Sequence, residues 1–212
     1  MILRDAQHTA DHLKEWMKDE SVDTPLLIGP AKSSIMCEPL GVAGIMGSWN
    51  YPYLTTIMPL VAVIAAGNCA VIKPSEMSPH SSLMVKRLVI RHLDSNCYKV
   101  VEGAVNVAIK MTSTKFDQII FTGSTEKGKL VAKAAAENLV PCLLELGGKS
   151  PCIIDKGCDV EFAAWKLAFM SFLNSGQTCI RPDYVLIDYS LVNEFVEHMK
   201  KAMDKWYDGG KI

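Results

Sequence analysis

The 212-residue sequence has no excess of charge of either sign, no long apolar run and no closely paired cysteines, and each absence excludes a class of protein. The 22 Lys and Arg residues nearly balance the 23 Asp and Glu residues and form no basic stripe, so nucleic acid is not an expected partner. The longest apolar run, Ile57 to Gly67, contains Pro59 and is shorter than the roughly 20 residues that cross a bilayer. No membrane segment is therefore predicted.

The seven cysteines form an odd set without a Cys-x-x-Cys pair, which favours a reducing compartment over a disulfide framework. The N-terminus is too charged for a secretory signal, so the expected location is cytoplasmic. A metal site is not expected, because His8 and His12 have no third ligand nearby in the sequence. Six cysteines occur in mostly apolar segments and are expected to be small buried side chains: Cys37, Cys69, Cys97, Cys142, Cys152 and Cys158.

Cys179 has a different setting from the other cysteines. It follows Gly176, Gln177 and Thr178, small or polar residues that leave a backbone open to approach, and it is expected to end a helix. The local sequence leaves a structural and a reactive thiol equally open. Glu145, a carboxylate followed by Leu146 and the glycines Gly147 and Gly148, precedes it in the chain. A thiol with a carboxylate could act as nucleophile and general base.

Short apolar runs alternate with helical stretches along most of the chain. The runs predict strands and are bounded by glycine, proline or small polar residues: Gly41–Met46, Ala70–Ile72, Lys99–Val101, Gln118–Phe121 and Cys142–Leu146. Helical patterns precede, separate or follow them: Asp5–Asp19, Thr55–Ala66, Pro79–Leu93 and Thr125–Asn138. This alternation predicts an α/β fold with a doubly wound, parallel, Rossmann-like sheet.

A second alternation after Gly148 predicts the beginning of another α/β domain. Its expected elements are a strand at Cys152–Asp155, a helix at Val160–Leu173, a strand at Tyr184–Asp188 and a helix at Leu191–Tyr207. The domain boundary is placed at Gly147–Gly148, which gives domains of residues 1–147 and 148–212.

Three loops follow predicted strands at the positions where doubly wound sheets bind ligands: Ser48–Pro52, Lys73–Glu76 and Gly123–Gly128. The third has two glycines and opens a helix, which suits a pyrophosphate, although plain helix initiation capped by Thr125 explains it equally well. Neither the G-x-G-x-x-G fingerprint nor the P-loop motif occurs, so nucleotide binding is only one interpretation of this loop.

Six segments in a fixed order, however, carry a resemblance that covers nearly the whole chain: Trp49–Pro52, Ala66–Asn68, Ile72–Glu76, Phe121–Thr125, Leu144–Pro151 and Asn174–Cys179. Together they resemble the aldehyde dehydrogenase superfamily, most closely its class 3, fatty-aldehyde-type branch. The resemblance implies NAD(P)-dependent oxidation of an aldehyde to a carboxylic acid through a cysteine thiohemiacetal and a thioester. By that resemblance Cys179 would be the nucleophile, Glu145 the general base, and the Asn50 amide with the Cys179 backbone amide the oxyanion hole.

The resemblance also implies a dinucleotide-binding role for the first domain. Lys73 and Glu76 would bind the adenosine ribose, Gly123 and Ser124 the pyrophosphate, and Trp49 and Gly128 complete the cofactor loops. A carboxylate such as Glu76 repels a 2′-phosphate and favours NAD, whereas Lys73 softens the repulsion and leaves NADP as the alternative. Structural alternatives stay open: a helix cap at Asn50, a solvated turn at Lys73 and Glu76, and a strand-end acid at Glu145.

The sequence departs from the family pattern in several places, and these departures leave other functions than aldehyde oxidation open. Such enzymes are homodimers of much longer chains, so the resemblance implies an N-terminally shortened dinucleotide-binding domain, the first part of a catalytic domain, and no dimer-building segment. One alternative is therefore a truncated, non-catalytic relative that binds NAD or a partner without turnover, and another is a thioester hydrolase. Arg181 and Lys127 replace small or aliphatic residues. The Arg181 cation is expected to lower the pKa of Cys179 or to crowd the substrate tunnel.

Overall fold

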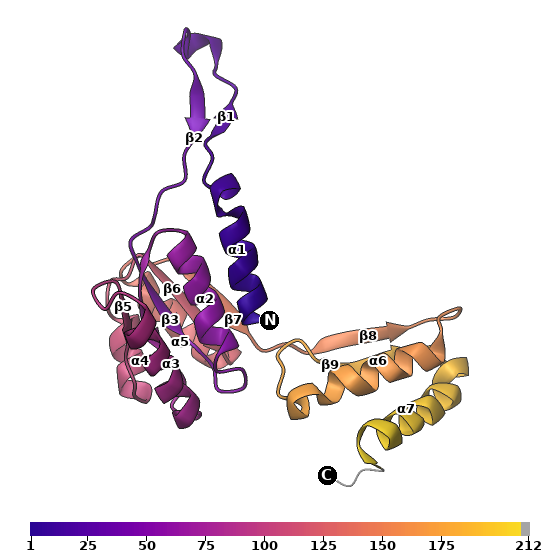
Figure 1. Cartoon of the computed structure of the whole chain (residues 1–212). Coiled ribbons are helices and arrows are strands. Elements are labelled where there is room, and N and C mark those ends of the chain that lie inside the picture. Colours follow the sequence, from indigo (N-terminus) through magenta and orange to yellow (C-terminus); the bar gives the residue numbers. More distant parts are fainter. Residues whose placement is uncertain (209–212) are drawn as a thin grey trace. The chain divides into compact units, whose positions relative to one another are not determined.

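The computed structural model describes residues 1–208 and divides into two compact units, one formed by Met1–Glu145 and one beginning at Leu146 (Figure 1). Each unit has its own buried apolar residues. The predicted α/β fold class with a doubly wound parallel sheet is confirmed by the strand order and pairing of the first unit.

The central sheet has the order β5-β4-β3-β6-β7. Its strands are β3 (Val42–Met46), β4 (Cys69–Lys73), β5 (Tyr98–Val100), β6 (Gln118–Gly123) and β7 (Cys142–Leu146). The pairs β3/β4, β4/β5 and β3/β6 are parallel. The chain builds outward from β3 through β4 to β5 and then crosses to β6 on the other side of β3. The boundary between β3 and β6 is therefore the switch point at which such sheets bind ligands.

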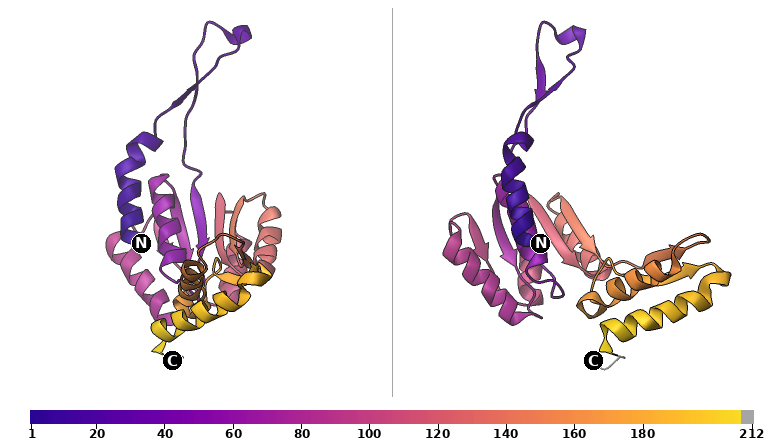
Figure 2. Two further views of the ribbon diagram at one scale, coloured as in Figure 1. Left: turned by 90° about the vertical axis from the view of Figure 1, so that its right-hand side faces the viewer. Right: turned by 45° about the vertical axis from the view of Figure 1, so that its right-hand side comes forward.

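Helices cover both faces of this sheet (Figure 2). On one face Ile45 and Ile72, both fully buried, pack with residues of α2 (Leu54–Ala65) and α3 (Pro79–His92). On the other face Ile119 packs with residues of α4 (Val105–Thr112) and α5 (Thr125–Ala136). Burial on both faces explains why the strand segments are almost continuously apolar.

Two parts of this unit differ from the sequence-based expectation. The first helix, α1, spans Ile2–Trp16 rather than residues 5–19, and the extended segments after it form an antiparallel hairpin of β1 (Glu20–Val22) and β2 (Ser33–Ile35), with a short 3-10 turn η1 (Leu26–Ile28) at its tip. The sequence pattern does not predict α4. Val105, Val107 and Ile109 recur at every second position, as in a strand, and the helix forms because Ala108 and Met111 pack into the core.

The second unit repeats strand and helix in the predicted order. Its elements are β8 (Ser150–Ile154), α6 (Val160–Phe172), β9 (Pro182–Ile187) and α7 (Val192–Trp206), with 3-10 turns η2 (Leu173–Gly176) and η3 (Tyr189–Leu191). Strands β8 and β9 are parallel, with Cys152 opposite Val185. Ile154, Leu167 and Phe195 contribute to its core, and Asp159 caps α6 by accepting a hydrogen bond from the Phe162 amide at 2.9 Å.

Candidate active site

The carboxyl ends of three neighbouring strands lie level at one edge of the central sheet. Met46 of β3 is paired with Lys73 of β4 on one side and with Phe121 of β6 on the other. The three loops predicted to bind ligands leave from these ends, so the register brings them to the same edge, beside the switch point.

Lys73 and Glu76 form an ion pair at this edge. Lys73 is only 5% exposed, and its Nζ donates hydrogen bonds to Glu76 Oε2 at 2.8 Å and to the Pro74 carbonyl at 3.3 Å. The Lys73 hydrogen bond, followed by the Glu76 backbone N–H, lowers the pKa of the Glu76 carboxyl. The alternative of a fully solvated turn is wrong for Lys73, whereas the Glu76 side chain is 46% exposed and accessible to a ligand.

The glycine loop after β6 opens α5 by a serine cap. Ser124, not Thr125, is the N-cap residue, and its Oγ accepts a hydrogen bond from the Lys127 amide at 3.3 Å. A Cβ atom at Gly123 would lie 2.5 Å from the Phe121 ring, so a larger residue there would require the ring to move. Gly128 is buried one turn into the helix, and the Lys127 side chain is exposed.

Asn50 lies in the loop between β3 and α2. Its Oδ1 accepts a hydrogen bond from Ser48 Oγ at 2.6 Å, and the Ser48 amide donates to Thr55 Oγ1 at 3.0 Å. The helix α2 begins at Leu54 after Tyr53, so the alternative that Asn50 caps it is wrong. With the amide oxygen held by Ser48, the amide nitrogen of Asn50 is the group that could donate to an oxyanion. Trp49, next to it, is exposed.

Glu145 and Cys179 belong to different units, and each is described within its own unit. Glu145 is an exposed residue of β7 between the partly buried Leu144 and Leu146. Cys179 is also exposed, in the loop between α6 and β9. Because α6 ends at Phe172, the prediction that Cys179 ends a helix is wrong.

The cysteine loop has an unusual backbone. Asn174, Ser175 and Gly176 take positive φ values of 54°, 55° and 73°, in the left-handed region that Gly and Asn adopt more readily than Ser. The Arg181 amide then donates to the Thr178 carbonyl at 3.2 Å, which closes a turn around Cys179. A positive φ at a residue such as Ser175 is uncommon, and such residues are often found in functional loops.

The glycines that follow Glu145 in the chain reach the cysteine loop. A Cβ atom at Gly148 would lie 3.0 Å from the Cys179 carbonyl oxygen, whereas one at Gly147 would meet nothing within 4 Å. Gly148 and Cys179 are 31 residues apart in the sequence, and the second unit brings their backbones together. A side chain at Gly148 would therefore require the cysteine loop to shift by a few tenths of an ångström.

Sequence reasoning missed Asp183, a charged residue beside the cysteine loop. It pairs with Arg181 at 2.8 Å and with Lys149 at 2.9 Å. The Lys149 hydrogen bond is the largest cause that lowers the pKa of the Asp183 carboxyl, with Arg181 contributing further. The sequence could have indicated this ion pair, because Asp183 follows the unusual Arg181 by two positions and side chains two apart lie on the same side of an extended segment.

The remaining cysteines are less buried than predicted. Cys37 and Cys158 are exposed, and the other four are partly exposed, so the expectation of buried thiols is wrong. Of these four, Cys142 and Cys152 still pack against the apolar cores of their units. Among residues 1–208 no group of three His, Cys, Asp or Glu side chains could hold a metal ion.

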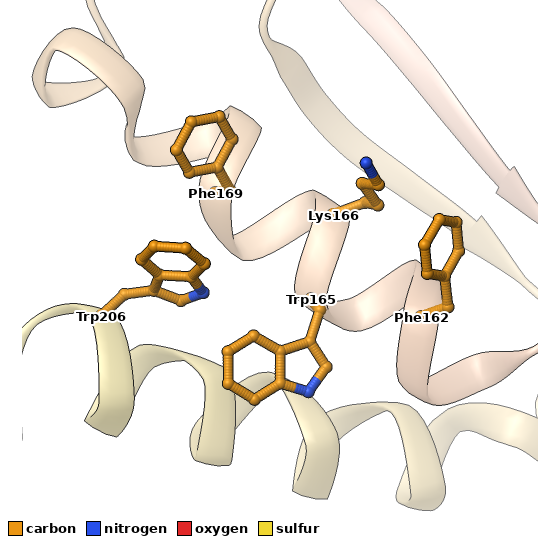
Figure 3. Close-up of a pocket in the computed structure, with 5 residues that line it drawn as sticks. All are labelled: Phe162, Trp165, Lys166, Phe169 and Trp206. Atoms are coloured by element: carbon orange, nitrogen blue, oxygen red, sulfur yellow. The ribbon is translucent and has the colours of Figure 1, made fainter.

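An apolar hollow in the second unit is separate from these residues. Figure 3 shows that it lies between α6 and α7, and its lining residues are Phe162, Trp165, Lys166, Phe169 and Trp206. It contains none of the candidate catalytic residues.

The comparisons with known proteins agree with this architecture. Residues 3–211 match the aldehyde dehydrogenase family model. The chain is 44% identical over 206 residues to the dimeric NADP-preferring aldehyde dehydrogenase of Mus musculus, and the match covers 97% of this chain and 46% of that protein. It is 41% identical over 206 residues to aldehyde dehydrogenase family 3 member A2 of Pongo abelii, covering 97% of this chain and 42% of the relative.

A solved structure is similar over almost the full chain. The substrate-bound state of Staphylococcus aureus AldH has a TM-score of 0.94 and 40% identity, covering 98% of this chain and 45% of that one. The chain belongs to the aldehyde dehydrogenase family, and the resemblance to its class 3 branch is confirmed. It spans less than half the length of these relatives. Within residues 1–208, no helix combines the length and the apolar character needed to cross a membrane.

Proposed function

We propose that this chain carries the nucleophile and the dinucleotide site of an enzyme that oxidises an aldehyde to a carboxylic acid with a nicotinamide cofactor. The observation that carries the proposal is the exposed Cys179, in a loop that begins with three residues of positive φ and whose backbone lies against Gly148, three residues after Glu145. Family membership supports aldehyde oxidation in general. The particular roles of the residues are part of the proposal.

The chemistry assigned to the side chains is covalent. The Cys179 thiolate attacks the aldehyde carbon and forms a thiohemiacetal, whose oxygen gains negative charge. The Asn50 amide nitrogen, oriented by the hydrogen bond from Ser48, and the Cys179 backbone amide donate to that oxygen. After oxidation the sulfur carries a thioester, and Glu145 takes a proton from the water that hydrolyses it.

The residues at the edge of the central sheet suit a dinucleotide. The start of α5 offers backbone amides to a pyrophosphate beside Ser124, and the paired Lys73 and Glu76 offer a donor and an acceptor to ribose hydroxyls. When bound, the nicotinamide ring supplies the two-electron acceptor. The ionised Glu76 favours NAD, and Lys73 keeps NADP as the alternative. One relative is named as NADP-preferring.

Binding and turnover are tested separately on the 212-residue chain. We expect calorimetric titration with NAD and with NADP to give saturable binding that Glu76→Gln weakens for NAD. With a panel of apolar and aromatic aldehydes, absorbance at the reduced-nicotinamide band should rise and should be abolished in Cys179→Ala. Cys158→Ala, which removes another exposed thiol, is the matched control and should keep the signal.

The outcomes distinguish the competing functions. Binding without an absorbance rise would contradict catalysis by this chain and support the second candidate, a non-catalytic relative that binds a dinucleotide. Ester cleavage that needs Cys179 but no cofactor would instead support a thioester hydrolase. An intracellular location fits seven cysteines that are all thiols, and a homodimer is proposed by analogy with the relative named as dimeric.

A further inference from the structure

Three charged side chains of the second unit, Lys149, Arg181 and Asp183, form a cluster at the segments that flank the cysteine loop, and the proposed mechanism uses none of them. Asp183, the second residue of β9, accepts a hydrogen bond from Arg181 Nη2 at 2.8 Å through Oδ1. Its other oxygen, Oδ2, lies 2.9 Å from Lys149 Nζ. One carboxylate therefore joins two cations that come from different segments of the second unit.

Each of these cations is attached to a segment that holds the cysteine. Arg181 closes the turn around Cys179 through its amide, and its Cδ would lie 3.7 Å from a Cβ atom at Gly176, at the start of the loop. Lys149 directly follows Gly148, whose backbone lies against the Cys179 carbonyl. The carboxylate thus ties both sides of the Cys179 backbone to β9.

The three side chains differ in burial, and Asp183 is the most buried of them. The side chain of Asp183 is 17% exposed, that of Arg181 35% and that of Lys149 84%. Such partly exposed pairs contribute little to the free energy of unfolding, because water screens them. Their effect is expected to be local: without the carboxylate, two positive charges would remain beside the cysteine loop, and nearby cations favour a thiolate over a thiol.

We propose that Asp183 is a positioning residue for Cys179. Its carboxylate holds Arg181 and Lys149 and offsets their positive charge at the cysteine sulfur. The inference rests on the proposed role of Cys179 as nucleophile. It changes the expectation for Arg181: the guanidinium is directed onto Asp183, and its charge is largely compensated there.

The test measures how the rate of Cys179 alkylation by iodoacetamide depends on pH in the full chain. Trypsin does not cleave between Arg181 and Pro182, so the peptide of residues 167–200 contains Cys179 as its sole cysteine and reports its modification by mass spectrometry. We expect Asp183→Asn to lower the midpoint of the rate–pH profile, which raises the rate at pH 7 about two- to fivefold. The plateau rate at high pH should not change.

Two further variants separate charge from structure. Asp188→Asn removes a carboxylate at the opposite end of β9, where it pairs with Lys156 at 3.5 Å, and should leave the Cys179 midpoint unchanged. Adding Arg181→Gln to Asp183→Asn removes one uncompensated cation and should return the midpoint toward that of the unmodified chain.

An unchanged midpoint in Asp183→Asn would overturn the inference, as would a rate increase of equal size at every pH, which indicates only a loosened loop. These outcomes are independent of the turnover assay. Turnover that persists in Cys179→Ala refutes the proposed function, whereas the alkylation midpoint alone decides the role of Asp183.

Discussion

At the scale of single residues, the two consecutive glycines after Leu146 have different surroundings. A side chain at Gly148 would meet the Cys179 carbonyl, which is backbone and cannot rotate aside, whereas one at Gly147 would project into open space. Neither has a φ in the left-handed region. The two positions therefore form a matched pair for testing how closely the chain segments approach.

We predict that Gly148→Ala is less stable than Gly147→Ala by about 1 kcal/mol. Both substitutions reduce the entropy of the unfolded chain equally, so their difference isolates the contact in the folded state. The free energies of unfolding are measured by urea denaturation. Equal values for the two variants would contradict the close approach of Gly148 to Cys179.

The sequence motifs predict which residues belong to the candidate site, but not the hydrogen bonds and the burial of their side chains. The motifs selected Cys179, Asn50 and Lys73, but only coordinates show that Ser48 holds the Asn50 amide and that Lys73 is buried. Asp183 was missed because its importance depends on Lys149, 34 positions away in the chain. Pairings of this kind come from tertiary folding and leave no local pattern.

At the scale of elements, the start of α5 combines a structural and a proposed ligand-binding role. Ser124 Oγ accepts the Lys127 amide, which is one of the donors left without a helical partner at the first turn. The same residue is a proposed pyrophosphate contact. A substitution there should therefore change stability even when no cofactor is present.

We predict that Ser124→Ala lowers the free energy of unfolding by about 1 kcal/mol in the absence of cofactor, because the cap is lost. Thr125→Ala is the matched control, since Thr125 is inside the helix and alanine is the better helix former there. Thermal denaturation followed by circular dichroism compares the variants. A larger loss in Thr125→Ala would restore Thr125 as the cap.

The sequence pattern predicts the elements whose apolar residues form one clear pattern. It does not predict those whose pattern is weak or is typical of another kind of element. The strands around Ile45 and Ile119 are continuous apolar runs, and their parallel pairing follows from the helices between them. In contrast, α4 has the alternation of a strand, and the hairpin of β1 and β2 joins short polar segments with little apolar signal. Tertiary packing decided the conformation of α4.

At the scale of the whole molecule, four carboxyl groups within residues 1–208 share a lowered pKa: Glu76, Glu102, Asp183 and Asp188. The largest cause is a hydrogen bond from Lys73, Lys86, Lys149 and Ser190, respectively. Each lies below its ordinary value of 4.5 for Glu or 3.8 for Asp, so the folded chain binds fewer protons than the unfolded chain in this range.

These groups contribute their full stabilisation at neutral pH. We therefore predict that they cause no change of the free energy of unfolding with pH near neutrality, and that this free energy falls as the pH drops below about 4.5, through the lowered pKa values. Urea denaturation at several pH values measures this dependence. In Lys86→Gln, which removes the donor 2.7 Å from Glu102, the decline should be shallower. A stability that rises toward pH 3 would contradict the assignment of these ion pairs.

The surface positions of Cys37, Cys158 and Cys179 also determine how assembly can be studied. Each molecule presents three thiolate-forming groups to its neighbours, and air oxidation can link such groups between copies. Dimers seen in ultracentrifugation or gel filtration without a reductant would therefore include covalently cross-linked copies together with any non-covalent dimer. Counting subunits reliably requires a reductant such as dithiothreitol in the sample.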